Sequence, residues 1–281
     1  MLWKHFRRDQ PEELARLTAD FYRHYRLAAA KLMPDIPLLF SDFSLNSFSQ
    51  VAHLRRLGAP ELLGRVPEYL AAVRSCRAQL DPQDVLLATT FSPLGLVGLW
   101  ATPASIAELG SGDRRVAHLV LQALGHFTSR VAELCLEAGA DGVYYSCWGQ
   151  DVLSPEQYAE LGTPYDLAGL EGARGGEFRL LHVHGALDSG VERYREYPAQ
   201  VVGWSEVESR LGLPEGAGLL PGQLVMGGIR EVRGEDALLR DRQRALELRA
   251  ALPQGWILAP GCSLPDDTTE STFTELRRLV E

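Results

Sequence analysis

Apolar positions along this chain recur with two alternating patterns, which predict helices separated by short strands. A helical spacing begins at Pro11 and runs to Lys31, and further amphipathic stretches cover 66–80 and the segment from Asp113 to Gly139. Short apolar runs between Gly, Pro or charged residues predict strands at 36–40, 85–91, 142–146, 179–184, 200–204, 223–229 and 256–260.

Near-continuous apolar strands that alternate with helices are typical of a parallel sheet covered on both faces. Seven such strands, with an eighth compatible with residues 2–6, predict an α/β fold in which one domain, 1–281, forms a closed (β/α)8 TIM barrel. An open doubly wound sheet is the second interpretation, but no GxGxxG follows the first strand and no Walker loop is present. In a barrel, functional side chains are expected at the carboxyl ends of the strands.

Composition narrows the class of partner. The formal net charge of -9 and the sequence pI near 5.4 disfavour binding to a nucleic-acid backbone. The four cysteines form no CxxC pair, which favours reduced thiols in a cytoplasm, and no apolar run approaches the roughly 18 residues that a membrane span needs. We therefore expect a soluble cytoplasmic protein that binds a small molecule, with neither a nucleic acid nor a membrane as partner.

Two histidines and a cysteine follow predicted strands. His182 and His184 are two residues apart, so their imidazoles are expected on one face of a strand, and Cys262 follows the last strand. Two imidazoles and a thiolate are credible zinc ligands, with Asp188 as a fourth ligand or an orienting group. The alternative is that the histidines are hydrogen-bonded barrel-lining residues and that Cys262 only fills space.

Aromatic and charged residues supply further candidates. Tyr145 and Trp148 stand at the end of the predicted strand 142–146, where they can form a pocket wall, although Tyr144 and Tyr145 must face opposite ways. Asp42 follows another predicted strand, as a catalytic carboxylate or a helix cap. Arg230, with Arg233 near it, is the candidate for anion contacts, or a solvated loop charge.

Three stretches resemble one known family. Tyr145-Ser-Cys-Trp-Gly-Gln-Asp-Val-Leu-Ser-Pro-Glu-Gln-Tyr158, followed by Pro164-Tyr165, resembles the aspartate-serine-tryptophan and serine-proline-glutamate segment of uroporphyrinogen decarboxylases. Leu38-Leu-Phe-Ser-Asp-Phe43 looks like their phenylalanine-serine-aspartate motif, which would give Asp42 the role of the aspartate central to decarboxylation. Ile257-Leu-Ala-Pro-Gly-Cys-Ser-Leu-Pro-Asp-Asp-Thr268 is similar to the last-strand motif of the wider superfamily, which includes the methylcobalamin:thiol methyltransferases.

Departures from the family pattern bear on the reaction. The arginine-rich segment with which the decarboxylases grip substrate carboxylates is not found, only Lys4, Arg7 and Arg8 stand near its place, and the last-strand histidine is missing. Both departures disfavour uroporphyrinogen as the substrate, because buried carboxylates need paired cations. The resemblance implies that His182, His184 and Cys262 stand where the methyltransferases hold zinc, with one cysteine changed to histidine.

Three hypotheses follow. In the first, a zinc-dependent methyltransferase uses His182, His184 and Cys262 to activate a substrate thiol toward a corrinoid methyl donor such as methylcobalamin or a corrinoid protein. In the second, a metal-free decarboxylase acts on uroporphyrinogen or a related tetrapyrrole through Asp42 and Tyr145, with Trp148 and Arg230 as substrate-binding residues. The third is a barrel that binds a tetrapyrrole or corrinoid without chemistry. The resemblance also implies a homodimer.

Overall fold

The computed structural model describes residues 1–36, 38, 64–100, 102–188, 190–232, 234 and 236–279. Two residues singled out in the sequence, Asp42 and Arg233, lie outside these ranges.

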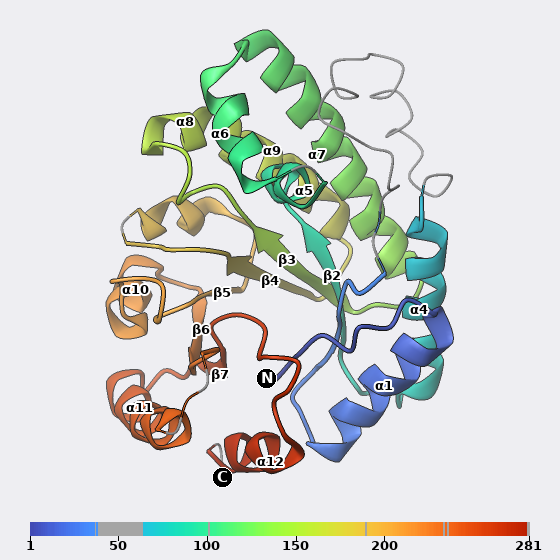
Figure 1. Ribbon diagram of the computed structural model, residues 1–281, viewed down its shortest axis with the longest axis vertical. Helices are drawn as coiled ribbons and strands as arrows, with labels where there is room; N and C mark the ends of the chain where they lie inside the picture. The colour runs from blue at the N-terminus through green and yellow to red at the C-terminus, as the bar shows by residue number, and fades with distance from the viewer. Residues whose placement is uncertain are drawn as a thin grey trace.

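The described part of the chain forms one seven-stranded sheet in which all strands are parallel and follow one another in chain order. The sheet curves into a half-barrel, with helices along its outer side (Figure 1). Parallel neighbours require a crossover between them, and helices supply most of these connections. The strands are β1 (Ala30–Leu32), β2 (Leu86–Phe91), β3 (Gly142–Cys147), β4 (Phe178–Val183), β5 (Val201–Trp204), β6 (Leu224–Ile229) and β7 (Ile257–Pro260).

The first residues of the chain do not form the eighth strand that the sequence allowed. Lys4 makes a single parallel bridge with Leu264, and the amide of Leu264 donates to the carbonyl of Trp3 at 3.2 Å. The amino group of Met1 donates to the carbonyl of Leu258 in β7 at 2.5 Å. The fold is therefore an α/β half-barrel whose open side receives residues 1–6, and the predicted closed eight-stranded barrel is not confirmed.

Helices occupy the segments that the amphipathic pattern predicted, with one exception. The first helix ends at His24 rather than near Lys31, because Arg26 adopts a left-handed backbone with a φ of 47°. The helices are α1 (Pro11–His24), α4 (Val66–Gln79), α5 (Pro93–Trp100), α6 (Pro103–Ser111), α7 (Arg114–Glu137), α8 (Pro155–Leu161), α9 (Thr163–Leu170), α10 (Leu213–Leu219), α11 (Ala237–Ala251) and α12 (Glu270–Arg278), with short 3-10 helices η2 (Glu171–Ala173) and η3 (Val191–Glu196).

The first strand is also displaced from its predicted place. β1 takes Ala30–Leu32, which the sequence pattern assigned to the end of a helix, whereas Ile36 lies in a bend. Pro34 and Pro37 flank Ile36 in the sequence, and proline cannot donate to a strand ladder, which explains why Ile36 is not part of a strand. The predicted strand at 36–40 was therefore wrong at Ile36, and most of that range lies outside the described residues.

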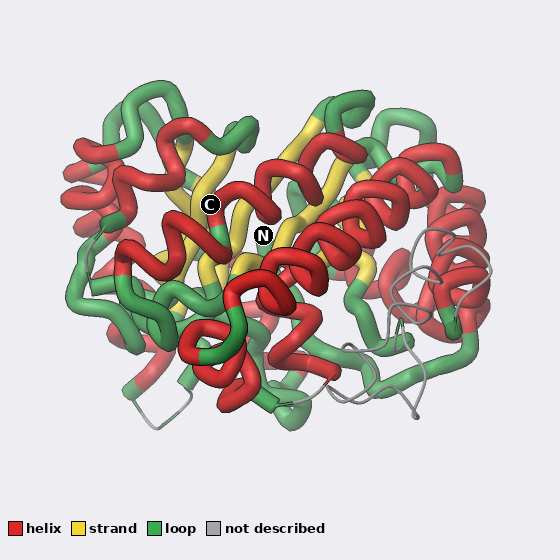
Figure 2. Tube along the Cα trace, turned by 90° about the horizontal axis from the view of Figure 1, so that it is seen from above, coloured by secondary structure: helices red, strands yellow, loops and turns green. Residues whose placement is uncertain are grey.

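The two largest apolar cores lie on opposite faces of the sheet. Seen from above, helices flank the strands (Figure 2). The larger core fills the space between the sheet and the helices. The smaller core lies inside the half-barrel and combines Trp3, Ala29, Met33, Leu87, Tyr144, Leu180, Val201, Met226 and Ala259.

We predict that Gly142→Ala destabilises the protein by about 2–3 kcal/mol, the range for overpacking a tight core. A Cβ at Gly142 would stand 2.0 Å from the carbonyl oxygen of Phe178, its register partner in β4, and that backbone cannot move without opening the sheet. Gly218→Ala is the matched control, because a Cβ there meets nothing within 4 Å on the exposed side of α10. The control should leave stability unchanged or raise it by up to about 1 kcal/mol. Urea unfolding measures both, and equal effects would contradict the prediction.

Candidate functional site

A cavity of about 640 Å³ opens at the carboxyl ends of the strands, inside the half-barrel. Its size lies within the usual range for small-molecule sites, roughly 300–1,000 Å³. Most of its wall is aromatic or aliphatic, with a few polar groups. It is lined by Trp3, His5, Lys31, Met33, Pro34, Ile36, Leu38, Thr89, Phe91, Leu96, Leu99, Trp100, Tyr144, Ser146, Trp148, His182, His184, Cys262 and Ser263.

The alternation of side chains along the strands decides which residues reach this cavity. Tyr144 and Ser146 are two apart on β3, so they share a face. Register carries the same face across the sheet, because Ser146 is paired with Phe91 of β2 on one side and with His182 of β4 on the other. His184 follows β4 two residues after His182 and reaches the same wall.

The two histidines and Cys262, proposed from the sequence as metal ligands, do line this one cavity. The rings of His182 and His184 are nearly perpendicular, with centroids 6.1 Å apart. His184 stacks on Trp148 at 4.1 Å between centroids, and the indole Nε1 of Trp148 donates to Ser146 Oγ at 3.0 Å. Trp148 therefore fixes the plane of the His184 imidazole.

The donors suit zinc in kind but not in arrangement. Two imidazoles and a thiol are zinc ligands, yet the described residues contain no group of three His, Cys, Asp or Glu side chains placed to hold one ion. The amino group of Lys31 also lies near these donors, since its charge acts to lower the pKa of both His182 and Cys262. A metal ion there would be repelled by that charge. As placed, the three donors do not fit a bound metal.

Burial sets the protonation of these groups. Burial, followed by the charge of Lys31, holds the pKa of His182 well below its ordinary value, and burial also lowers the pKa of His184 despite the nearby Asp151. Burial raises the pKa of the Cys262 thiol, although the Ser263 amide and Lys31 oppose this effect. At neutral pH the cavity therefore offers neutral imidazole nitrogens and a protonated thiol.

Lys31 is a site residue that the sequence reasoning missed. Its Nζ lies 3.6 Å from the ring centroid of Tyr144 and 4.3 Å from that of Trp3, and the residue is 7% exposed. Burial lowers the pKa of Lys31 to about 7, against the opposing influence of Cys262 and Asp35. The signal was present, because Lys31 is one of only two lysines in the chain and interrupts the apolar stretch 27–33.

His5 and Asp35 form a pair beside the cavity that the sequence reasoning also missed. His5 lines the cavity and its Nδ1 lies 2.5 Å from Oδ1 of Asp35, while the amides of Phe6 and Arg7 donate to Oδ2 of that carboxylate at 2.7 and 2.8 Å. Burial raises the pKa of Asp35, but these hydrogen bonds outweigh it and lower the pKa overall. The pair ties the N-terminal segment to the loop after β1, a contact between positions 30 residues apart that spacing alone could not reveal.

The sequence profile of the family described as Uroporphyrinogen decarboxylase (URO-D) matches residues 5–281. The chain belongs to the URO-D family. No curated protein sequence matches it.

Solved structures share the fold of this URO-D chain at low identity. A methyltransferase from Methanosarcina mazei superposes with a TM-score of 0.72 at 16% identity, over 97% of this chain and 84% of the other. A B12-independent methionine synthase from Shewanella sp. W3-18-1, in complex with selenomethionine, gives 0.61 at 10% identity over 96% and 85%. A putative vitamin-B12 independent methionine synthase from Listeria monocytogenes gives 0.60 at 13% over the same shares. In the described part of the URO-D chain, no helix is long and apolar enough to cross a membrane.

The remaining candidates of the URO-D chain fall in different places. Trp148 lines the cavity, as the pocket-wall interpretation predicted. Arg230 lines a separate cavity of about 380 Å³ beside α11 and is not among the residues that line the main cavity. Asp188 accepts from the amide of Arg210 at 2.7 Å and is not among the residues of the main cavity. Asp42 lies outside the described residues.

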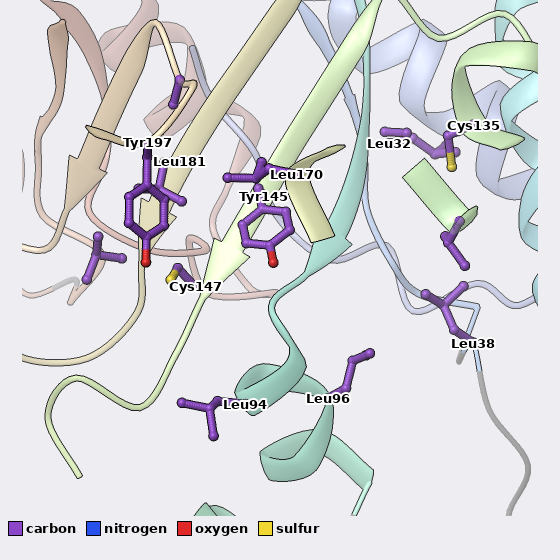
Figure 3. Packing of buried hydrophobic residues seen from close by; sticks show 14 of the residues in the cluster. Leu32, Leu38, Leu94, Leu96, Cys135, Tyr145, Cys147, Leu170, Leu181 and Tyr197 are labelled. Carbon is purple, nitrogen blue, oxygen red and sulfur yellow. The ribbon is translucent and has the colours of Figure 1, made fainter. Parts of the chain in front are cut away.

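Tyr145 belongs to the core behind the sheet and not to the cavity (Figure 3). Its hydroxyl donates to the carbonyl of Asp166 in α9 at 3.3 Å. The catalytic role predicted for Tyr145 is therefore corrected: strand alternation gives the cavity position to Tyr144 instead.

The carboxylate of Asp166 is the centre of this cluster behind the sheet. It is fully buried, and its Oδ2 accepts from the hydroxyls of Tyr158 and Tyr197 at 2.7 and 2.9 Å and from Cys147 Sγ at 3.2 Å. Burial raises the pKa of Asp166 to about 6, although these hydrogen bonds act to lower it. The charged carboxylate of Asp166 is costly to bury, so the protonated acid is the form that stabilises the fold. This stabilisation is complete below about pH 4, the pKa of this group in the unfolded chain, and is lost as the pH rises through about 6.

We predict that Tyr197→Phe destabilises the protein more at pH 7 than at pH 4. At pH 7 the hydroxyl donates to a charged carboxylate, a bond worth about 1.5–3 kcal/mol, against about 1 kcal/mol for the neutral acid at pH 4. Tyr22→Phe is the control, because that hydroxyl donates to Asp84 at a partly buried position near the surface. Urea unfolding at both pH values measures the difference, and an effect of Tyr197→Phe that is the same at both would disprove it.

Proposed function

We propose that the chain is a methyltransferase that moves a methyl group from a donor to a small thiol held in the main cavity. The observation that carries the proposal is the wall formed by His182, His184 and Cys262, three neutral nitrogen and sulfur groups at one cavity of small-molecule size. The methyltransferase among the structural neighbours supports the same class of reaction.

In the proposed reaction the sulfur of the acceptor attacks the methyl carbon of the donor. A carbon–sulfur bond forms, the bond from carbon to the donor breaks with its electron pair remaining on the donor, and the thiol proton leaves. His182 would receive that proton, because its neutral imidazole lines the cavity, and burial with the charge of Lys31 makes it a weaker base than a free histidine. The aromatic wall, including Trp148, would keep water from the reacting sulfur.

The decarboxylase and the non-catalytic alternatives receive less support. Tyr145 packs in the core behind the sheet, so one of the two groups assigned to decarboxylation does not line the cavity. The neighbours quoted above are a methyltransferase and methionine synthases rather than binding proteins.

We predict that His182→Asn lowers kcat/KM for methyl transfer by at least about 100-fold, the lower range of general-base effects. Methylcobalamin serves as the donor and 2-mercaptoethanol or 3-mercaptopropionate as the acceptor, with the S-methyl product measured by mass spectrometry. His126→Asn is the matched control, because His126 is exposed on α7 away from the cavity. No S-methyl product from any donor and thiol pair with the folded wild-type protein would refute the proposed function.

The zinc hypothesis has a separate test. From the placement of the donors, we expect well under one zinc per chain in purified protein after incubation with zinc and desalting. Elemental analysis measures the content in the wild type and in a His182→Ala/Cys262→Ala variant. About one zinc per chain that disappears in the variant would contradict this expectation and establish the triad predicted from the sequence.

A further inference from the structure

The amino group of Lys31, which is partly protonated at neutral pH because burial lowers its pKa to about 7, faces the cavity without a carboxylate partner among the described residues. Its close contacts there are the ring faces of Tyr144 and Trp3, at 3.6 and 4.3 Å to the ring centroids. Such faces attract a cation through the quadrupole of the ring, and more strongly when the pair is desolvated. They hold the ammonium in place but supply no negative charge.

The neighbouring groups do not neutralise this charge. Both oxygens of Asp35 are engaged, one by His5 and the other by the amides of Phe6 and Arg7. Burial keeps the thiol of Cys262 protonated. A buried charge that lacks a partner is costly, so an anion supplied from outside would be stabilised at this point.

Tyr144 provides a second, independent sign of a ligand at the same end of the cavity. The residue is 1% exposed and lines the cavity, and its hydroxyl has no hydrogen-bond partner among the described residues. A buried hydroxyl normally finds a partner, because leaving it unpaired costs its desolvation free energy with no hydrogen bond to offset it. The same residue contacts the ammonium through its ring, so both unpaired groups lie close to one another.

The rest of the wall limits the chemistry of the ligand. Phe91, Leu96 and Trp148 present apolar surface, which suits a ligand with an apolar body. One ammonium and one hydroxyl match a single carboxylate, whereas a polycarboxylate or a phosphate dianion would leave charge unpaired in this wall.

We propose that Lys31 and Tyr144 form a carboxylate-binding end of the cavity, and that the substrate is a small monocarboxylate with an apolar body. The inference rests on the proposed function only in taking this cavity as the substrate site. It adds the substrate class and requires neither a methyl donor nor turnover.

The test is binding, measured by titration calorimetry with phenylacetate and 3-phenylpropanoate and with the uncharged amides of both acids. The wild type should bind the carboxylates at least about 10-fold more tightly than the amides, since a hydrogen bond to a charged group is worth that much or more. Lys31→Met should remove the preference, and Tyr144→Phe should weaken carboxylate binding by several fold. Circular dichroism and thermal unfolding confirm that the variants are folded.

Two matched controls separate this site from general effects. Lys4→Met removes the other lysine, whose Nζ donates to the carbonyl of Asp266 at the surface, and Tyr145→Phe makes the same change on the opposite face of β3. Both should keep the wild-type preference. Equal affinity for acids and amides, a preference that survives in folded Lys31→Met, or saturable binding of neither acid would overturn the proposal.

The outcomes also distinguish this inference from the proposed function. Carboxylate selectivity without S-methyl product would leave the binding site standing and remove the methyl-transfer reaction. Methyl transfer to 2-mercaptoethanol and 3-mercaptopropionate with equal kcat/KM, unchanged in Lys31→Met, would leave the reaction standing and remove the carboxylate site.

Discussion

The alternation of side chains along parallel strands is the constraint on which both the core and the cavity depend. Residues two apart on a strand share a face, and the in-step register of β2, β3 and β4 extends that face across the sheet. One face therefore collects Tyr144, Ser146 and His182 inside the half-barrel, while the other packs Tyr145 and Cys147 against the helices. A shift of one residue in the register of β3 would turn Tyr145 and Cys147 toward the cavity and Tyr144 and Ser146 toward the helices.

Burial then gives the inner face its chemical character. Removing imidazoles from water disfavours their charged form, so His182 and His184 are neutral nitrogen groups. The same effect acts on Lys31, but two ring faces contact its ammonium, and we propose that an anionic ligand in the cavity is its partner. The cavity thus combines an apolar wall, neutral donors and one cationic point.

The sequence predicted the parts of the molecule that depend on local pattern. Strands β2 to β7 and the long helix α7 follow from apolar periodicity, and the cavity position of His182, His184, Trp148 and Cys262 follows from their place at strand ends. The parts that it missed depend on long-range contact. β1 is short and its apolar run reads equally as helix, and nothing in the spacing shows that residues 1–6 enter the open side of the sheet beside β7.

The sequence pattern alone does not decide which of Tyr144 and Tyr145 faces the cavity. Alternation required that only one of the two face the cavity, but the sequence did not say which, because each face of that strand carries one tyrosine and no charged residue. Register with β2 and β4 decides it, since Tyr144 lies opposite Thr89 and Leu180, which also face inward or line the cavity. The same placement brings Tyr144 against Lys31. Assigning Tyr145 rather than Tyr144 to the cavity therefore also hides the contact between Tyr144 and Lys31. The charge of Lys31 is the one that we propose selects the substrate.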